Sequence, residues 1–198
     1  DGYKERILNL SPAQKGEIRA DLTKTSDAAE LAFQEAERLT LVDREKAIEA
    51  YKRAIKLRPA YPDAFVALAR VQSETGDLED AEQAIASARK LRPAFAEASA
   101  VLGRIYKDLG QEEKAIAAFQ RAITEGKGFQ PEALAGLGLL YKERAEGFGG
   151  SGEFEDEQAN YTEAAKYLQR SVKQISGAPD AVVIYQLLGL VYERMQRF

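Results

Sequence analysis

Apolar residues recur along this chain at intervals of three and four, which is the period of an amphipathic helix. Four segments share one spacing, and their residues are Phe65, Leu68 and Ala69; Ser99, Leu102, Gly103 and Tyr106; Leu134, Leu137, Gly138 and Tyr141; and Tyr185, Leu188, Gly189 and Tyr192. Gly76 and Gly110 follow two of these segments, where a helix commonly ends in a left-handed residue. The pattern predicts short amphipathic helices separated by tight turns.

A second kind of segment alternates with the first and repeats with a fixed period. Residues 46–59, 80–93 and 114–123 are similar to one another. Proline recurs from Pro59 to Pro93, a shift of 93 − 59 = 34, and alanine from Ala47 to Ala81 to Ala115, two further shifts of 34. The unit is therefore helix, tight turn, helix, and internal repetition at this length is typical of helical solenoids.

These units resemble the tetratricopeptide repeat, whose 34-residue signature runs from a large residue through Leu-Gly, Tyr and Ala-x-x-x-Phe to Pro. The residues that carry the resemblance are Ala69, Ala81, Pro93, Leu102, Gly103, Tyr106, Ala115, Phe119, Leu137, Gly138, Tyr141, Leu188, Gly189 and Tyr192. A looser copy of the second-helix element is Ala164 with Leu168. The resemblance covers roughly residues 28–198 and implies an all-α fold, a right-handed α-solenoid of helix-turn-helix repeats.

The signature residues have a packing role. Gly103, Gly138 and Gly189 leave room for the second helix of a repeat to approach the first closely. Glycine inside a helix costs up to about 1 kcal/mol relative to alanine, so close packing has to offset it. Large residues such as Phe119 and Tyr192 are expected to fill the space between successive hairpins.

The domain organisation follows from the repeat. We expect an N-terminal helical extension or cap over residues 1–27, a degenerate first repeat over 28–61, a second over 62–95, a third over 96–130, a fourth over 131–181 and the first helix of a truncated fifth over 182–198. The apolar residues of that last helix, including Ile184, Leu187, Leu188 and Val191, are expected to lie uncovered together with Phe198. Either the natural chain continues or something covers this end, because terminal repeats need a cap.

The fourth repeat contains an insert. Its matching alanine is Ala164 rather than a residue near position 150, so 164 − 150 = 14 residues are added, roughly 146–159. Four of the six residues from Gly147 to Gly152 are glycine, and acidic residues follow. This predicts a mobile or irregular loop. The motif Gly-x-Gly-x-x-Gly occurs here, but it lacks the preceding strand of a dinucleotide-binding unit and is interpreted as a turn.

Composition and charge remove several classes of function. The chain of 198 residues has a net charge of −4 and a pI near 5.2, which does not favour nucleic acid binding. It contains no histidine and no cysteine, so the commonest general base and the thiolate ligands are absent. We predict no enzymatic activity, no cofactor and no metal site.

Nothing in the sequence indicates direct membrane insertion, since no stretch approaches about 18 apolar residues. The compartment is not indicated either. We expect a soluble protein, cytoplasmic or periplasmic, with any targeting segment absent from this chain, which begins at Asp1.

The resemblance implies that the first helix of each repeat faces a concave groove that takes peptide ligands. Projection of these helices predicts a groove lined by Val66, Arg70, Ala100, Arg104, Lys107, Ala135, Leu139, Lys142, Gln186 and Leu190. Four of these residues are cations and would form a basic ladder on an acidic protein. Alternatively, Glu74, Asp108 and Glu143 neutralise the ladder locally. The paired asparagines with which chaperone-binding members of the family hold a C-terminal carboxylate are absent from these helices.

The leading hypothesis is an adaptor or scaffold that binds a peptide or protein partner in this groove, with acidic groups in the ligand. The alternative is a structural spacer, or a module of a larger protein that self-associates through its open C-terminal end.

Overall fold

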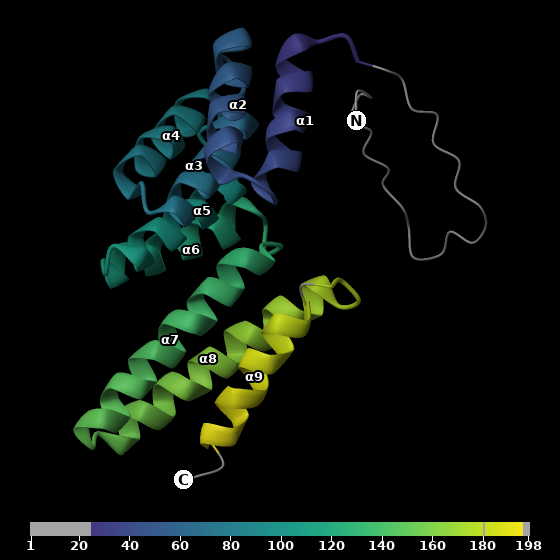
Figure 1. Ribbon diagram of the computed structural model, residues 1–198. Coiled ribbons are helices and arrows are strands. Elements are labelled where there is room, and N and C mark those ends of the chain that lie inside the picture. Colours follow the sequence, from purple (N-terminus) through teal and green to yellow (C-terminus); the bar gives the residue numbers. More distant parts are fainter. Residues whose placement is uncertain (1–24, 180, 196–198) are drawn as a thin grey trace, which may run out of the picture.

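The computed structural model describes residues 25–179 and 181–195, and this part of the chain is all-α (Figure 1). Its helices are α1 (Ala28–Thr40), α2 (Arg44–Leu57), α3 (Pro62–Thr75), α4 (Leu78–Leu91), α5 (Ala96–Asp108), α6 (Glu112–Glu125), α7 (Pro131–Ser151), α8 (Phe154–Ile175) and α9 (Ala181–Met195). The predicted N-terminal cap lies almost entirely outside the described residues, as does Phe198.

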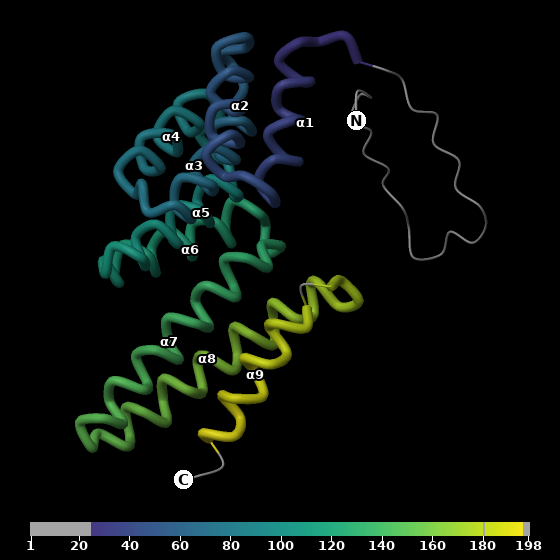
Figure 2. Tube along the Cα trace, viewed as in Figure 1, coloured from purple at the N-terminus to yellow at the C-terminus, as the bar shows by residue number. Residues whose placement is uncertain are grey.

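Consecutive helices pair as hairpins, and the hairpins stack. The most extensive contacts join α1 to α2, α3 to α4, α5 to α6 and α7 to α8, while α9 packs on α8. Further contacts join α1 to α3, α3 to α5 and α5 to α7, so the first helices of successive hairpins form a layer of their own. Figure 2 shows the hairpins following one another from α1 to α9. The predicted all-α solenoid is confirmed.

The helix ends follow from local sequence. Asp27 and Asp43 precede α1 and α2, and their carboxylates accept hydrogen bonds from backbone N–H groups of the first turn. Gly76 and Gly110 adopt left-handed conformations, with φ of 91° and 69°. The prediction that these two glycines end helices in the left-handed region is confirmed.

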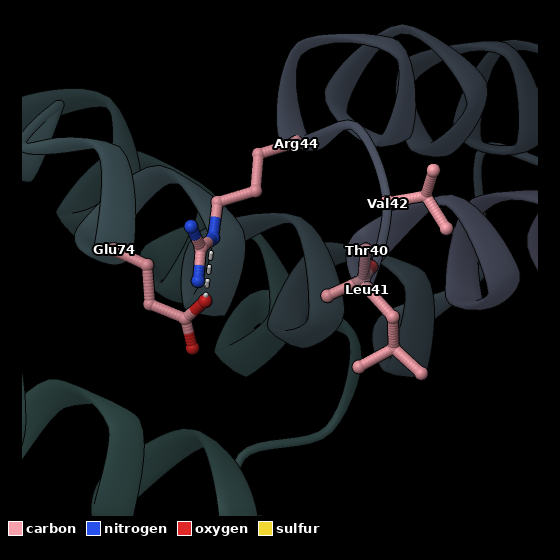
Figure 3. Close-up of a pocket in the computed structure, with 5 residues that line it drawn as sticks. All are labelled: Thr40, Leu41, Val42, Arg44 and Glu74. Carbon is pink, nitrogen blue, oxygen red and sulfur yellow. Dashed lines mark hydrogen bonds and ion pairs between the residues drawn. The ribbon is translucent and has the colours of Figure 1, made fainter.

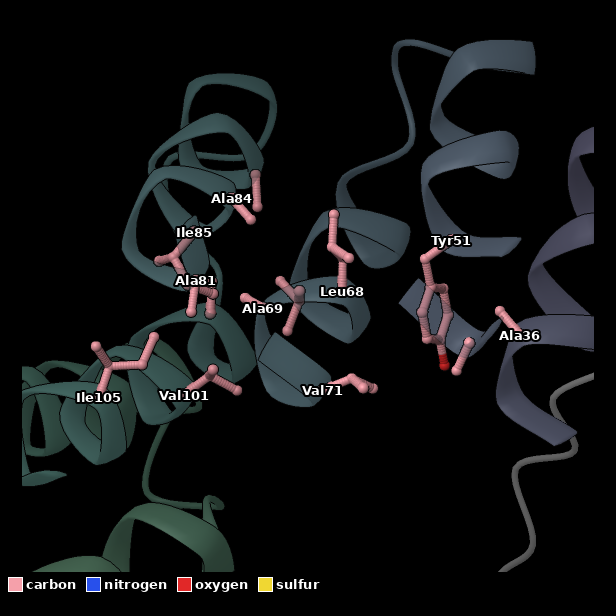
Figure 4. Packing of buried hydrophobic residues seen from close by; sticks show 14 of the residues in the cluster. Ala36, Tyr51, Leu68, Ala69, Val71, Ala81, Ala84, Ile85, Val101 and Ile105 are labelled. Carbon is pink, nitrogen blue, oxygen red and sulfur yellow. The ribbon is translucent and has the colours of Figure 1, made fainter. Parts of the chain in front are cut away.

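The core divides into three consecutive clusters rather than one. The first spans α1 to α5 and is rich in fully buried alanine, including Ala36, Ala69 and Ala81 (Figure 4). The second joins α5, α6 and α7, and the third joins α7, α8 and α9. Helix α5 contributes Val101 to the first cluster and Ala100 to the second. A hairpin inside the array thus packs one face on the preceding hairpin and the other face on the following one, as in other repeat proteins.

Glycine marks the closest helix crossings. A Cβ atom on Gly103 would lie 2.5 Å from the Phe119 ring, and one on Gly136 would lie 2.4 Å from the same ring. At the next hairpin a Cβ atom on Gly138 would lie 2.6 Å from Leu168. These helices approach so closely that no side chain is accommodated at the crossing points, which explains the small residues of the repeat.

The predicted loop at residues 146–159 is wrong. Helix α7 continues to Ser151 and α8 begins at Phe154, so nearly all of the insert is helical. The turn is confined to Gly152, at φ 79°, and Glu153. High glycine content argued for a loop, but packing of the two long helices against each other outweighs the low helix propensity of glycine.

The predicted open face of the last helix also differs. Leu188 and Val191 are buried against α8, with 8% and 0% of their surface exposed. The exposed apolar residues of α9 are instead Val182, Val183, Tyr185, Leu190 and Tyr192. The predicted face was the one that α8 covers.

Candidate functional site

A cavity of about 370 Å³ opens where the layer of first helices meets the C-terminal hairpin. It is lined by Arg70, Arg104, Pro131, Glu132, Ala135, Ser171, Ile175 and Ile184, which come from α3, α5, α7, α8 and α9. Three of these residues, Arg70, Arg104 and Ala135, belong to the predicted groove. We call this cavity the Glu132 pocket, after the carboxylate between its two arginines.

Glu132 connects three successive repeats. Its two oxygens accept hydrogen bonds from Nη1 and Nη2 of Arg70, both at 2.8 Å, in a bidentate pair. Its Oε1 also lies 3.7 Å from Nη1 of Arg104. Burial would lower the pKa of the Arg70 guanidinium, but the charge and hydrogen bonds of Glu132 outweigh burial and raise that pKa above its usual range. Two guanidinium groups therefore share the carboxylate of Glu132.

Arg104 makes few of the hydrogen bonds that a guanidinium offers. Its Nε and Nη2 atoms are buried, and neither has a hydrogen-bond acceptor among the described residues. An unpaired buried donor costs about 1–3 kcal/mol. The Arg104 side chain as a whole is 28% exposed and lines the cavity. Part of its hydrogen-bonding capacity is therefore unused at this site.

The other predicted cations do not extend a free basic ladder. Lys107 lies 3.3 Å from Asp108 and 3.8 Å from Glu143, and Lys142 donates to Glu146 at 2.7 Å. Each of the four cations therefore has a carboxylate within ion-pair distance. Of the acidic residues named from the sequence, Asp108 and Glu143 lie beside Lys107, and the negative charge of Glu74 contributes to the raised pKa of Arg70. Glu74 also pairs with Arg44, at 3.2 Å.

The remaining groove residues are dispersed. Ala100 is fully buried, because it packs in the cluster between α5, α6 and α7, so the prediction that it lines the groove is wrong. Val66 is 6% exposed and borders a separate hollow of about 300 Å³ with Arg70 and Phe95. Leu139 is half-buried, while Gln186 and Leu190 are exposed on α9 and do not line the Glu132 pocket.

Sequence reasoning missed Glu132 and the apolar wall of Ile175 and Ile184. A signal for Glu132 was present. An acidic residue stands six positions before the crossing residue in three first helices, as Asp63, Glu97 and Glu132. Such residues lie in the first turn, where negative charge is favourable.

Comparison with known families supplies the decisive observation. Models of the tetratricopeptide repeat match residues 43–105 and residues 96–125. Over residues 43–125 the chain belongs to the tetratricopeptide-repeat family. No curated protein sequence matches it.

Solved structures share the fold of this tetratricopeptide-repeat protein. A crystal structure of MamA aligns with a TM-score of 0.56 and 22% identity, covering 74% of this chain and 82% of the other. The TPR domain of Arabidopsis OM64 aligns with a TM-score of 0.53 and 22% identity, covering 57% and 93%. The first TPR of Spaghetti (RPAP3), bound to the HSP90 peptide SRMEEVD, gives 0.54 and 18%, covering 59% and 92%. At these identities the likeness shows the fold alone.

Another hollow of the tetratricopeptide-repeat chain lies at the α1–α2 turn, with a volume of about 500 Å³ (Figure 3). The turn exposes Leu41 and Val42, with 90% and 81% of their surface accessible, and Arg44 pairs with Glu74 across the hollow. The other residues that line this hollow, Thr40, Leu41 and Val42, are uncharged.

Two negative findings concern the described residues. None of the helices there is both long and apolar enough to cross a bilayer. The same residues contain no group of three or more acidic side chains arranged to hold a metal ion.

Proposed function

We propose that this chain is a protein-protein interaction module that binds a peptide or protein segment along the groove of its first helices, with the Glu132 pocket as the main contact. The observation that carries the proposal is the pair of guanidinium groups that share one carboxylate. A ligand carboxylate at this position would supply the second acceptor.

The ligand chemistry follows from the walls of the pocket. Arginine holds a carboxylate with two parallel hydrogen bonds, which also fixes its orientation. Ala135, Ile175 and Ile184 offer apolar contact beside the arginines. The preferred ligand is therefore a segment in which Asp, Glu or a terminal carboxylate is next to an aliphatic side chain. Apolar burial would provide most of the affinity, and charge the orientation and association rate.

An interaction module also agrees with the chemistry that is absent. The 198 residues contain neither histidine nor cysteine, so a nucleophile activated by an imidazole or a thiolate is not available. The tetratricopeptide repeat of RPAP3 is bound to a peptide with three acidic residues, which supports an acidic ligand for this fold.

Glu132 provides the sharpest test, because replacing it removes the carboxylate that Arg70 and Arg104 share. Binding of displayed peptide libraries to the full chain should select sequences with Asp or Glu beside Leu, Ile or Val. Affinity for a selected peptide should rise in Glu132→Gln, since both arginines then lack a carboxylate. It should fall in the triple variant Arg70→Gln, Arg104→Gln and Glu132→Gln, which leaves no charge unpaired.

Arg53→Gln on α2 is the matched control, because Arg53 pairs with Glu35 away from the pocket. It should bind like the parent, and rising salt should weaken parent binding through screening. Selection of peptides without acidic residues, or equal affinity in the triple variant, would show that another surface binds partners.

A further inference from the structure

A second hollow opens beside the Glu132 pocket, one repeat earlier in the layer of first helices. Its volume is about 300 Å³, and Val66, Arg70, Arg92, Phe95 and Glu97 contribute to its lining. We call it the Glu97 hollow. Arg70 lines both this hollow and the Glu132 pocket, so the two sites are neighbours. A ligand segment that lies in one of them is therefore in position to continue into the other.

The acidic residues in the first turns of α3, α5 and α7 occupy equivalent positions but differ in their pairing. Asp63 accepts hydrogen bonds from both terminal nitrogens of Arg92, at 3.0 Å and 2.9 Å, and Glu132 pairs with Arg70 in the same bidentate way. Glu97 is the exception. Within the part of the chain that the structure describes, no cation lies within ion-pair distance of its carboxylate, and no group donates a hydrogen bond to it.

The two arginines of the Glu97 hollow are engaged elsewhere. The guanidinium of Arg92 holds Asp63 and lies over the Phe95 ring, 4.1 Å from its centroid. The guanidinium of Arg70 points its two terminal nitrogens at Glu132. Each of these cations has a carboxylate of its own, whereas the exposed Glu97 has no cation. The charge that would complement this hollow is therefore positive, opposite to the charge that would complement the Glu132 pocket.

The walls of the Glu97 hollow suit the side chain of a lysine or an arginine. Val66 and Ala67 offer apolar surface to the methylene groups, and the Glu97 carboxylate accepts hydrogen bonds from the cationic group. Long cationic side chains commonly lie in this way, with the stem on apolar surface and the charged end in water. An acidic side chain in the same place would be repelled by Glu97.

The distance between the two sites sets the spacing within a ligand. The Glu97 hollow lies between α3 and α5, and the Glu132 pocket reaches α7, so the sites are about one helix spacing apart, roughly 8–10 Å. A chain in the polyproline II conformation rises about 3.1 Å per residue with about three residues per turn. Side chains three positions apart then share a face and are separated by about 9 Å.

We propose that the Glu97 hollow is a second subsite of the groove, and that it takes a lysine or arginine three positions from the acidic residue of the ligand. The ligand class is thereby narrowed from an acidic segment to a segment of mixed charge. This inference rests on the proposed function of the Glu132 pocket and adds Glu97 as a residue that determines specificity.

Short labelled peptides supply the probe. Capped Leu-Asp-Ala-Ala-Lys-Leu and its reverse-order form, Leu-Lys-Ala-Ala-Asp-Leu, are compared with forms in which Gln or Glu replaces Lys. Fluorescence anisotropy with the full chain should rank the Lys peptide above the Gln peptide, and the Gln peptide above the Glu peptide, in at least one of the two orders. Each step should change affinity by about two- to fivefold, which is the range of a partly exposed ion pair.

The decisive variant is Glu97→Lys, which should invert this ranking, so that the Glu peptide binds more tightly than the Lys peptide. Glu97→Gln should make the Lys and Gln peptides bind alike. The matched controls are Glu79→Lys and Glu79→Gln, because Glu79 is also an exposed carboxylate in the first turn of a helix, α4, and lines neither site. They should keep the ranking of the parent. Circular dichroism should show the parent helix content in all four variants, since both positions are exposed.

Two results would overturn the second subsite. One is a preference for the Lys peptide that persists in Glu97→Lys, and the other is equal affinity of the parent for the Lys, Gln and Glu peptides. If binding still falls in the triple variant of Arg70, Arg104 and Glu132, the proposed function stands and only the second subsite is wrong. Absence of binding by every peptide up to millimolar concentration would overturn both.

Discussion

The α5–α6 hairpin and the α7–α8 hairpin show one packing arrangement at two lengths. Helices α5 and α6 have 13 and 14 residues, whereas α7 and α8 have 21 and 22. Both hairpins cross at a glycine covered by a large residue, Gly103 with Phe119 and Gly138 with Leu168. The insert therefore lengthens the second hairpin without moving its crossing point.

The added length divides equally between the two helices. From crossing glycine to turn glycine the distance is 110 − 103 = 7 in the short hairpin and 152 − 138 = 14 in the long one. From the residue after the turn glycine to the crossing alanine it is 115 − 111 = 4 and 164 − 153 = 11. Each helix gains seven residues, which is close to two turns at 3.6 residues per turn. The apolar face consequently continues in the same direction, and the insert packs instead of forming a loop.

The largest effect on stability is expected from deletions in the α7–α8 hairpin. Removing residues 144–150 together with 154–160 takes seven residues from each helix and restores the length of the short hairpin. Removing 145–149 together with 155–159 takes five from each, which rotates each helix face by about 140° because successive residues turn by about 100°. We expect the first variant to unfold cooperatively and the second to lose the C-terminal cluster. Circular dichroism during thermal unfolding measures both.

Similar thermal unfolding of the two deletion variants would contradict the expected packing of the long hairpin. Equal stability would mean that the long tip contributes no directional packing. A difference between the two deletion variants would also argue against a loop, because a loop would tolerate either length.

The next largest effect is expected at the crossing points. Gly103→Leu and Gly138→Leu each insert a side chain where even a Cβ atom lies within 2.6 Å of a neighbour. Overpacking of this kind lowers the free energy of unfolding by about 1–3 kcal/mol or more. If both hairpins use the same crossing, urea titration should show similar losses in the two variants. A loss confined to Gly103→Leu would show that the longer hairpin can shift to relieve the strain.

Removing the carboxylate of an ion pair should cost more stability in the short hairpin than in the long one. Glu125 of α6 is 10% exposed and accepts hydrogen bonds from Ser99 at 2.6 Å and Arg89 at 3.1 Å. Glu125→Gln leaves the buried Arg89 without a carboxylate and should cost about 1–3 kcal/mol. The exposed Glu146 pairs with Lys142 one turn away in α7, and Glu146→Gln should change stability by about 0.5 kcal/mol or less. Equal costs in denaturant titrations would contradict the assigned burial.

The smallest effects concern the glycines of the long hairpin. Gly147 and Gly150 lie inside α7 with nothing within 4 Å, so Gly147→Ala and Gly150→Ala should each raise stability by about 0.5–1 kcal/mol. Gly152 has φ 79°, so Gly152→Ala should lower stability by about 1–2 kcal/mol. Shifts of the thermal midpoint in opposite directions would confirm that the turn is limited to Gly152 and Glu153. A stabilising Gly152→Ala would place the turn elsewhere.

Local periodicity was sufficient to predict most of the fold. The recurrence at 34 residues identified the hairpins, and Gly76 and Gly110 identified helix ends, because these features depend on neighbours in sequence. The helical insert was not predicted, since glycine content argues for a loop while the stabilising contacts come from a helix outside the segment. The length of the insert, 14 residues, was known from the sequence. It predicts two longer helices only when it is divided equally between them, which adds about two turns to each.

The candidate site was predicted less completely. Arg70 and Arg104 were recognised as residues of the first helices, and the structure brings them together. Glu132 was missed because it meets Arg70 across 62 residues, a contact that depends on how α3, α5 and α7 pack together. Ile175 and Ile184 come from the last two helices, which a projection of single helices does not bring near α3.

The ring of Phe119 has a mechanical consequence, because it lies against Gly103 of its own hairpin and Gly136 of the next one. A stack of hairpins behaves under tension like springs in series, so extension is greatest at the most compliant joint. At the joint between the α5–α6 and α7–α8 hairpins, separating α7 from α5 requires the Phe119 ring to leave Gly136 while it remains against Gly103. Because an aromatic ring is rigid, we expect the joint between the third and fourth repeats to resist small extensions more than a joint filled by flexible side chains would.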